Sequence, residues 1–387
     1  MPQPTDTGQR RVKIVHLIDD LSLSGTPQVL CKLLRSIDTQ RFENIVITLT
    51  NSVELGPLIE HVGVPVHPLG MTAGKPSLSL QIRLARLLRR LQPDLLQTWL
   101  GDQNMLGAQL GKLLGIKVIW NLRHAPLEAP ETSRQTQRAR AQCVRCSEIP
   151  EAMIVCSAKV QQAHVEMGYC AKRWVEIPNG FDTTLFAPNP DSRAQIRAEL
   201  GIEDEDVMLI GWIGRNIPVK DAGTLLAVAR LVTRARPRAH FVLAGSGCLT
   251  SFPDFAGISA EPKLMPYMHL LGPRTDIAVV TAALDIATMT SLSEGFPNVI
   301  GEAMACGVPC VVTETAGEAP TLIGETGLLA PPHDPRAFAD ALLKMIDMGA
   351  EARRALGAQA RERIIRQYTL PSVTAQYEAL YQEIAGV

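Results

Sequence analysis

Two glutamates, Glu294 and Glu302, stand eight positions apart where an apolar strand runs into a helix. The strand is predicted over Leu284–Thr290, Asn298 is expected to cap the helix, and Gly307 is expected to end it. Glu294 then lies in the strand-to-helix loop, and Glu302 lies about one turn into the helix. Carboxylates accept hydrogen bonds from hydroxyl groups, and a helix N-terminus offers unpaired N–H groups to an anion. Together these groups suit a sugar nucleotide.

The surrounding residues, Glu-Gly-Phe-Pro-Asn-Val-Ile-Gly-Glu-Ala-Met-Ala-Cys-Gly-Val-Pro, resemble the signature of retaining GT-B glycosyltransferases of family four, the group 1 type. The resemblance implies that Glu302 holds the ribose hydroxyls and that Glu294 holds hydroxyls of the donor sugar. It also implies donor contacts from the residues after Glu294, which are Gly295, Phe296, Pro297 and Asn298. Because two glutamates at this spacing are common, an ordinary strand, loop and helix with surface glutamates is the alternative.

Three cations are candidates for the donor phosphates and base. Arg215 and Lys220 follow the predicted strand Val207–Ile213, and they match in type and spacing the pair that the resembled family uses on the donor diphosphate. Preorganised cations would stabilise the negative charge that grows on the leaving nucleotide. Arg274 follows a later strand and is expected to border the nucleotide base. Ordinary solvated cations at these positions are the alternative.

Two further candidates lie in the first half of the chain. His124 follows the predicted strand Val118–Leu122, at the end of a strand where catalytic groups of such sheets gather. The resemblance places a histidine there beside the transferred sugar, whereas a plain loop histidine is the alternative. Gly25 lies in the loop after the first strand and would let the backbone approach a ligand. Ser24 stands where the resembled family commonly has another glycine.

The elements that must position these residues alternate between apolar runs and amphipathic helices, in two successive series. This pattern predicts an α/β protein with two Rossmann-like parallel-sheet domains, and the resemblance implies the GT-B arrangement in which they face across a cleft and a C-terminal helix crosses back to the first domain. Tyr377 and Tyr381 of that helix are expected to pack rather than to catalyse. The predicted parts are an acceptor-side domain 11–188, a linker 189–206, a nucleotide-sugar domain 207–369 and a terminal helix 370–387.

The composition excludes some classes of function. The 387 residues include 38 basic and 39 acidic side chains, so no overall field favours nucleic acid. No run of 18 apolar residues and no apolar leader occur, which indicates a cytoplasmic protein. An arginine-rich helix predicted over Leu80–Leu91 leaves peripheral contact with the inner membrane face open, with a solvated helix face as the alternative. Cys143 and Cys146 have no second pair with metal-binding spacing.

We therefore expect a retaining hexosyl- or N-acetylhexosaminyl-transferase that uses a UDP-linked sugar and a saccharide or lipid-linked acceptor, in bacterial-type polysaccharide or glycolipid synthesis. No Asp-x-Asp stands at the carboxyl end of a predicted strand, so the sequence predicts metal-independent transfer with no cofactor besides the nucleotide-sugar co-substrate. Two alternatives remain: a non-catalytic nucleotide-sugar-binding subunit and a sugar-nucleotide epimerase of the same fold.

Overall fold

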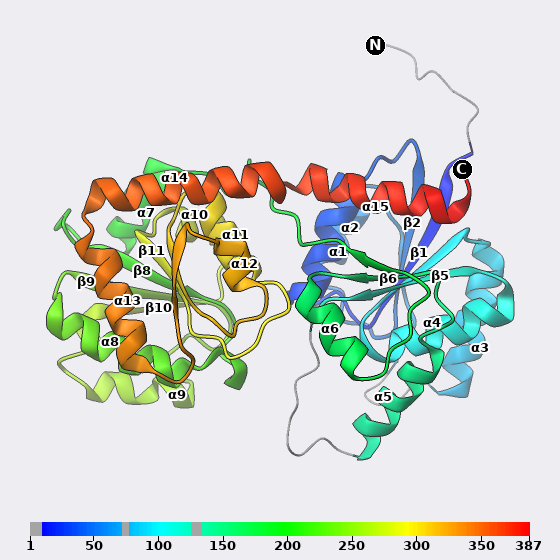
Figure 1. Cartoon of the computed structure of the whole chain (residues 1–387), viewed down its shortest axis with the longest axis horizontal. Coiled ribbons are helices and arrows are strands. Elements are labelled where there is room, and N and C mark those ends of the chain that lie inside the picture. The colour runs from blue at the N-terminus through cyan, green and yellow to red at the C-terminus, as the bar shows by residue number, and fades with distance from the viewer. Residues whose placement is uncertain (1–9, 72–76, 125–133) are drawn as a thin grey trace, which may run out of the picture. The chain divides into compact units, whose positions relative to one another are not determined.

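The computed structural model describes residues 10–71, 77–124 and 134–387. The chain divides into two compact units (Figure 1). The first unit combines Met1–Gly180 with Leu370–Val387, and the second unit is Phe181–Thr369. The expected linker 189–206 contains a helix, α7, which belongs to the second unit. Pro190 and the side chain of Asn189, which accepts a hydrogen bond from the Asp191 N–H, start this helix.

The first unit contains a parallel sheet with strand order β3-β2-β1-β4-β5-β6-β7. Its strands are β1 Val12–Ile18, β2 Phe42–Thr48, β3 Val66–Pro68, β4 Leu95–Trp99, β5 Lys117–Leu122, β6 Ala152–Val155 and β7 Trp174–Glu176. Its described helices are α1 Gly25–Ser36, α2 Gly56–Glu60, α3 Leu78–Leu91, α4 Gly101–Leu114, α5 Arg134–Cys146, α6 Ala158–Glu166 and α15 Leu370–Ala385. The short strand β7 was not predicted as a strand, because only three residues of it pair.

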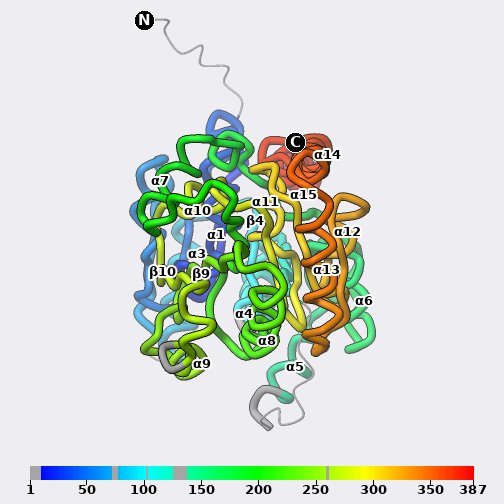
Figure 2. The backbone as a smooth tube through the Cα atoms, turned by 90° about the vertical axis from the view of Figure 1, so that its left-hand side faces the viewer, coloured from blue at the N-terminus to red at the C-terminus, as the bar shows by residue number. Residues whose placement is uncertain are grey.

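The second unit contains a parallel sheet with strand order β10-β9-β8-β11-β12-β13. Its strands are β8 Met208–Ile213, β9 Ala239–Ala244, β10 Met268–Gly272, β11 Ile286–Met289, β12 Cys310–Thr313 and β13 Gly327–Ala330. Its helices are α7 Pro190–Leu200, α8 Ala222–Ala235, α9 Pro253–Ala256, α10 Ile277–Ala282, α11 Asn298–Ala305, α12 Ala319–Ile323, α13 Pro335–Asp347 and α14 Ala350–Gln367, with 3-10 turns at Pro218–Lys220, Gly257–Ala260 and Met265–Tyr267. Figure 2 shows α8 beside α13 and α7 beside α10.

Each sheet is covered by helices because its strands are apolar on both faces. In the first unit, α1, α2 and α15 pack against one face in a shared core. Tyr377 and Tyr381 of α15 are buried in that core, which confirms their expected packing role. In the second unit, α8 and α13 cover the sheet with Leu225, Val232 and Phe338 in the core. The two predicted parallel-sheet, Rossmann-like domains are therefore confirmed.

Helix α11 differs from the prediction at its start and agrees at its end. Asn298 is the first helical residue and Pro297 precedes it as the cap, so Asn298 does not cap the helix. Gly307 adopts a left-handed φ of 74° just after the helix, and its N–H donates to the Met304 carbonyl at 2.9 Å. Glycine adopts this conformation without steric cost, as the sequence predicted for a helix end.

Candidate active site

The second unit brings three of the predicted residues to neighbouring strand ends. Arg215 and Lys220 follow β8, and Glu294 follows β11, which pairs with β8 in parallel. Strands β9 and β10 follow on one side of this pair, and β12 and β13 follow on the other side. The order of the strands therefore reverses between β8 and β11. Open parallel sheets bind ligands outside the carboxyl ends of the strands at such a point. The predicted cations and the first glutamate therefore lie where this kind of sheet holds a ligand.

Lys220 and Glu294 are joined directly. The Lys220 Nζ donates a hydrogen bond to Glu294 Oε1 in a close ion pair. The two side chains are 17% and 16% exposed, so most of the surrounding water is excluded and their attraction is stronger than at an open surface. A lysine ammonium carries three N–H groups, and one of them is used in this pair. The ammonium therefore retains donor capacity for an anion while it orients the carboxylate.

Thr290 ties together the two loops that carry this pair, and the sequence analysis missed it. Its Oγ1 donates to the Lys220 carbonyl at 2.8 Å and accepts from Trp212 Nε1 at 3.2 Å. A backbone hydrogen bond of 2.8 Å from the Leu292 N–H to the Val219 carbonyl adds a second connection. A threonine at a strand end carries no sequence signal for such a role, because its partners lie about seventy positions earlier.

Gly317 fixes the Glu294 loop from another side. Its φ is 54°, and a Cβ atom at this position would lie only 1.8 Å from the carbonyl oxygen of Glu294. No side chain fits there, so the turn after β12 approaches the loop that carries the first glutamate. Gly317 therefore lies directly against the backbone of Glu294.

Helix α11 carries the second glutamate in a buried position. Glu302 is 7% exposed and lies in the middle of the helix. Phe296 is also buried, and its ring packs against Phe181 at 6.2 Å and Tyr368 at 5.9 Å between centroids. Gly301 makes room for this cluster, because a Cβ there would lie 2.0 Å from the Phe181 ring. The Phe296 side chain therefore packs inside the second unit, and Gly295 and Pro297 beside it are buried as well.

Arg215 and Arg274 lie in opposite situations. Arg215 is exposed at the end of β8, and within the described part of the chain no ion pair engages its guanidinium. Arg274 is held by two carboxylates: Nε donates to Asp276 at 2.8 Å and Nη1 donates to Glu199 at 2.6 Å. These hydrogen bonds raise the pKa of Arg274 and keep it charged. Arg215 can therefore bind an anion without giving up an ion pair, whereas Arg274 would have to give up its pairs with Asp276 and Glu199.

The other two predicted residues, His124 and Gly25, belong to the first unit. His124 follows β5 and Gly25 begins α1 after β1, so both stand at carboxyl ends of strands in one parallel sheet. Partial desolvation, and then the nearby Arg140 guanidinium, lower the pKa of the His124 imidazole. The ring is therefore neutral at pH 7, with one nitrogen able to donate a hydrogen bond and the other able to accept one.

Arg123, next to His124, is a residue that the sequence analysis passed over. It is only 6% exposed, and its guanidinium donates to the Ile177 carbonyl at 3.0 Å, to the Tyr377 hydroxyl at 3.2 Å and to the Asn179 side chain. Arg123 thus connects the chain just before His124 to the segment that follows β7 and to α15. An arginine after an apolar strand looks like a surface cation in sequence, because its partners come from distant segments.

The described residues contain no group of three or more His, Cys, Asp or Glu side chains that could hold a metal ion together. None of the described helices combines the length and the apolar character needed to cross a bilayer. In α3 the predicted apolar face is buried through Leu84, Leu87 and Leu88, and the arginines face solvent. The membrane contact considered from the sequence stays a prediction.

Two family models match the chain. The model described as "Glycosyltransferase Family 4" matches residues 23–185, and the model described as "Glycosyl transferases group 1" matches residues 207–348. Among curated proteins, the chain is 30% identical over 198 residues to an N-acetyl-alpha-D-glucosaminyl L-malate synthase of Bacillus anthracis, a match covering 49% of each protein. It is 33% identical over 208 residues to a D-inositol 3-phosphate glycosyltransferase of Kineococcus radiotolerans, covering 49% of this chain and 47% of that protein. The chain thus spans about half the length of these relatives.

Solved structures resemble the whole chain. HepE of Anabaena in complex with UDP superimposes with a TM-score of 0.82 at 22% identity, covering 96% of this chain and 100% of HepE. Sucrose-phosphate synthase of Thermosynechococcus elongatus gives a TM-score of 0.76 at 20% identity, covering 97% and 99%. At these identities the likeness establishes the fold, and it confirms the predicted GT-B class.

Proposed function

Because the chain belongs to the group 1 and family 4 glycosyltransferases, we propose that it transfers a sugar from a nucleotide-sugar donor to a saccharide or lipid-linked acceptor. UDP is the proposed nucleotide, since HepE, which shares the fold, has been solved with UDP and with UDP-glucose. The transferred group is proposed to be a hexosyl or N-acetylhexosaminyl unit, and the pathway a bacterial-type polysaccharide or glycolipid synthesis.

The observation that carries this proposal is the Lys220–Glu294 ion pair at the reversal point of the second sheet. Lys220 offers its remaining N–H groups to the donor diphosphate, and Arg215, exposed at the end of the same strand, grips a second phosphate oxygen. Glu294, oriented by Lys220, accepts hydrogen bonds from hydroxyls of the donor sugar. Charge growing on the departing UDP is then met by cations already in place.

The second glutamate and its helix serve the nucleotide end in this proposal. Glu302 accepts hydrogen bonds from the ribose hydroxyls, and the backbone of Gly295 and Asn298 approaches the donor at the start of α11. Phe296 and Pro297 hold this loop by packing, since both are buried. Arg274 shapes the wall at the end of β10 through Asp276 and Glu199, and it borders the base without binding phosphate.

Transfer is proposed to retain the configuration at the sugar. The acceptor hydroxyl attacks from the face that UDP leaves, the bond from the sugar to the phosphate oxygen breaks, and that phosphate oxygen takes the acceptor proton. No protein nucleophile is needed, so differential stabilisation of the leaving diphosphate supplies the catalysis. His124, neutral at pH 7, donates a hydrogen bond to a substrate hydroxyl, and the backbone at Gly25 offers N–H groups at the start of α1. The reaction is proposed to need no metal ion.

A donor and acceptor screen tests the proposal. Purified protein is mixed with a panel of nucleotide sugars, with and without soluble and lipid-linked acceptors, and free nucleotide is measured. Release that depends on acceptor supports transfer, whereas binding without turnover would show a non-catalytic subunit. Conversion of the donor sugar without nucleotide release would show an epimerase. Lys220→Ala should abolish release, and Lys172→Ala, which removes a surface ion pair with Glu151 at 3.0 Å in the first unit, should not.

A further inference from the structure

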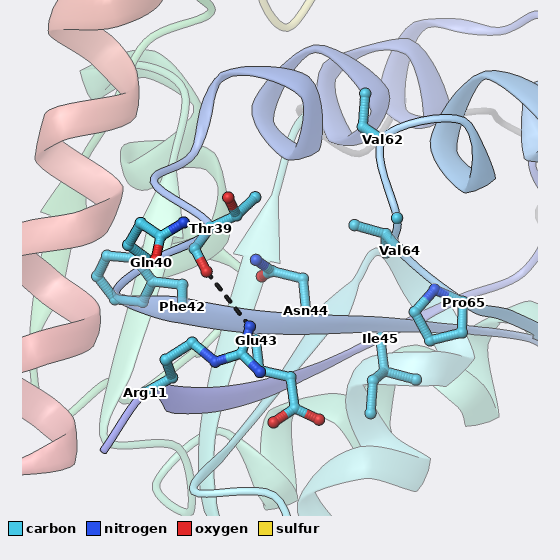
Figure 3. A pocket seen from close by; sticks show the side chains of 11 residues that line it. Arg11, Thr39, Gln40, Phe42, Glu43, Asn44, Ile45, Val62, Val64 and Pro65 are labelled. Atoms are coloured by element: carbon cyan, nitrogen blue, oxygen red, sulfur yellow. Dashed lines mark hydrogen bonds between the residues drawn. The ribbon is translucent and has the colours of Figure 1, made fainter. Parts of the chain in front are cut away.

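A pocket lies in the first unit at the amino ends of the strands, whereas Gly25 and His124 follow carboxyl ends of strands in the same sheet. Strand β3 pairs with β2 only over Val46–Thr48, so within the described residues no strand covers that side of β2 over Phe42–Ile45. A cavity of about 490 Å³ lies beside this uncovered segment (Figure 3). The pocket is lined by Arg11 just before β1, by the first half of β2 with the turn before it, and by the loop before β3.

A chain of hydrogen bonds fixes the orientation of one lining side chain, Asn44. The indole N–H of Trp99 can only donate, and it lies 3.3 Å from His16 Nδ1, which must therefore accept. The proton of the neutral His16 ring is then on Nε2, which donates to Asn44 Oδ1 at 3.0 Å. Burial lowers the pKa of His16 to about 4, in agreement with a neutral ring. The Asn44 oxygen is thus assigned, and its Nδ2 amino group points away from His16.

This amino group has two donors and no hydrogen-bond partner within the described chain. Asn44 is only 5% exposed, and a buried donor without a partner is costly. The side chain stands on β2 among the pocket residues (Figure 3). Because Nδ2 is covered, a ligand reaches it only after neighbouring side chains turn aside. The pocket lining includes the exposed side chains of Thr39 and Gln40. The pocket therefore contains a buried donor group that a ligand would satisfy.

The charges around the pocket favour a ligand with negative charge. Arg11 is exposed at its rim, where Nη1 makes a long hydrogen bond of 3.4 Å to the Thr39 carbonyl and leaves other N–H groups available. The carboxylate in the lining, Glu43, is balanced by Lys13 at 3.2 Å. The remaining wall is apolar through Val64 and its neighbours in the loop before β3. The carboxylate of the lining is therefore paired, whereas the positive charge of Arg11 has no ion-pair partner among the described residues.

We propose that this pocket binds a small organic anion, a carboxylate or a phosphate ester, with its charged group on Arg11 and another acceptor oxygen on the Asn44 Nδ2. The volume lies within the range of small-molecule sites. The pocket uses none of the residues assigned to donor binding or catalysis, so its occupancy can be tested separately from sugar transfer.

Calorimetric titration of the full chain with three compounds of similar size tests this inference: glucose, gluconate and glucose 6-phosphate. Gluconate or glucose 6-phosphate should bind, and glucose should bind at least tenfold more weakly because it lacks the charge. Arg11→Gln should weaken binding of the anion about tenfold. Arg10→Gln is the matched control, because the neighbouring Arg10 pairs with Asp94 at 2.6 Å outside the pocket, and it should bind as the wild type does.

Asn44→Leu removes the unpaired amino group at similar volume and should also weaken binding, with circular dichroism confirming that the variant folds. If it does not fold, the comparison of Arg11→Gln with Arg10→Gln decides. Equal binding of glucose and gluconate, no binding of either anion at millimolar concentration, or equal loss in the Arg10 and Arg11 variants would overturn the proposal. Binding of one anion alone identifies carboxylate or phosphate as the recognised group.

Discussion

Lys220 and Glu294 form an ion pair although 74 positions separate them in the sequence. Each residue follows a different strand of one sheet, and those strands, β8 and β11, are neighbours. The pair is mostly buried, and the loops that carry it are joined through Thr290. Because the lysine and the glutamate form one ion pair, a substitution of either residue also removes the charged hydrogen-bond partner of the other.

Removing either member of this pair should stop sugar transfer and leave the protein folded. Glu294→Ala leaves Lys220 without its carboxylate partner, and Lys220→Ala removes a donor that stabilises charge on the leaving group. A loss of at least about a hundredfold in kcat is expected for each, which leaves no release detectable above background. Nucleotide release is the measurement, with thermal unfolding as the check on folding. Wild-type rates in either variant would show that the assignment of the site is wrong.

Gly317→Ala should weaken donor binding in addition to lowering the stability of the fold. A left-handed φ costs a residue with a Cβ about 1–2 kcal/mol, and the new methyl group would also displace the Glu294 carbonyl. Gly349→Ala is the matched control, because its φ is 87° and no atom lies within 4 Å of the added Cβ. We expect both variants to lose stability in chemical denaturation, and only the Gly317 variant to lose affinity for the nucleotide-sugar donor. Equal affinities would argue against a role for Gly317 in placing Glu294.

Phe296→Ala should destabilise the second unit by about 3–5 kcal/mol, the usual cost of deleting a buried phenylalanine. The ring lies among Phe181 and Tyr368, and its loss leaves a cavity behind the Glu294 loop. Phe252→Ala serves as the control, because Phe252 is 40% exposed. Urea denaturation of both variants gives the comparison. A Phe296 variant as stable as the wild type would mean that the aromatic cluster contributes little to the fold.

Stability should fall as the pH drops from about 6.5 towards 4. Burial lowers the pKa of His16, His164 and His269 to about 4, below the unfolded value of 6.5. Between these values the unfolded chain binds protons that the folded chain does not, so acid favours unfolding. For His16 the loss is on the order of 3 kcal/mol when complete. Denaturation curves at pH 7 and pH 5 measure it, and His16→Gln should reduce the difference. An unchanged difference would contradict the neutral, buried ring.

Transfer should proceed at the same rate in the presence of excess EDTA. In the proposal Arg215 and Lys220 supply the positive charge that the leaving diphosphate needs. The rate is measured by nucleotide release before and after chelation, with a metal-dependent transferase as the positive control. Loss of activity on chelation, restored by Mg²⁺ or Mn²⁺, would refute metal-independent transfer.

The strand ends and the helix faces could be predicted from the sequence, because they depend on local periodicity and on glycines such as Gly307. The positions of the candidate residues after β8 and β11 follow from these strand ends, whereas the roles proposed for them come from the family resemblance. The partners of buried or paired arginines could not be predicted: Arg274 contacts Glu199 from 75 positions earlier, and Arg123 contacts Tyr377 from 254 positions later. The burial of Phe296 likewise depends on rings brought in from both ends of the second unit. Such contacts follow from packing and leave no local pattern.

Titration of UDP into the purified protein tests the central claim, that the carboxyl ends of β8 and β11 hold a nucleotide diphosphate. Arg215→Ala is compared with Arg238→Ala. Arg238 lies at the amino end of β9, at the opposite ends of the strands from the proposed site, and it pairs with Asp206 at 2.8 Å. The account predicts UDP binding that is at least tenfold weaker in the Arg215 variant and unchanged in the Arg238 variant. Equal affinities in the two variants, or no binding of UDP by the wild type, would contradict it.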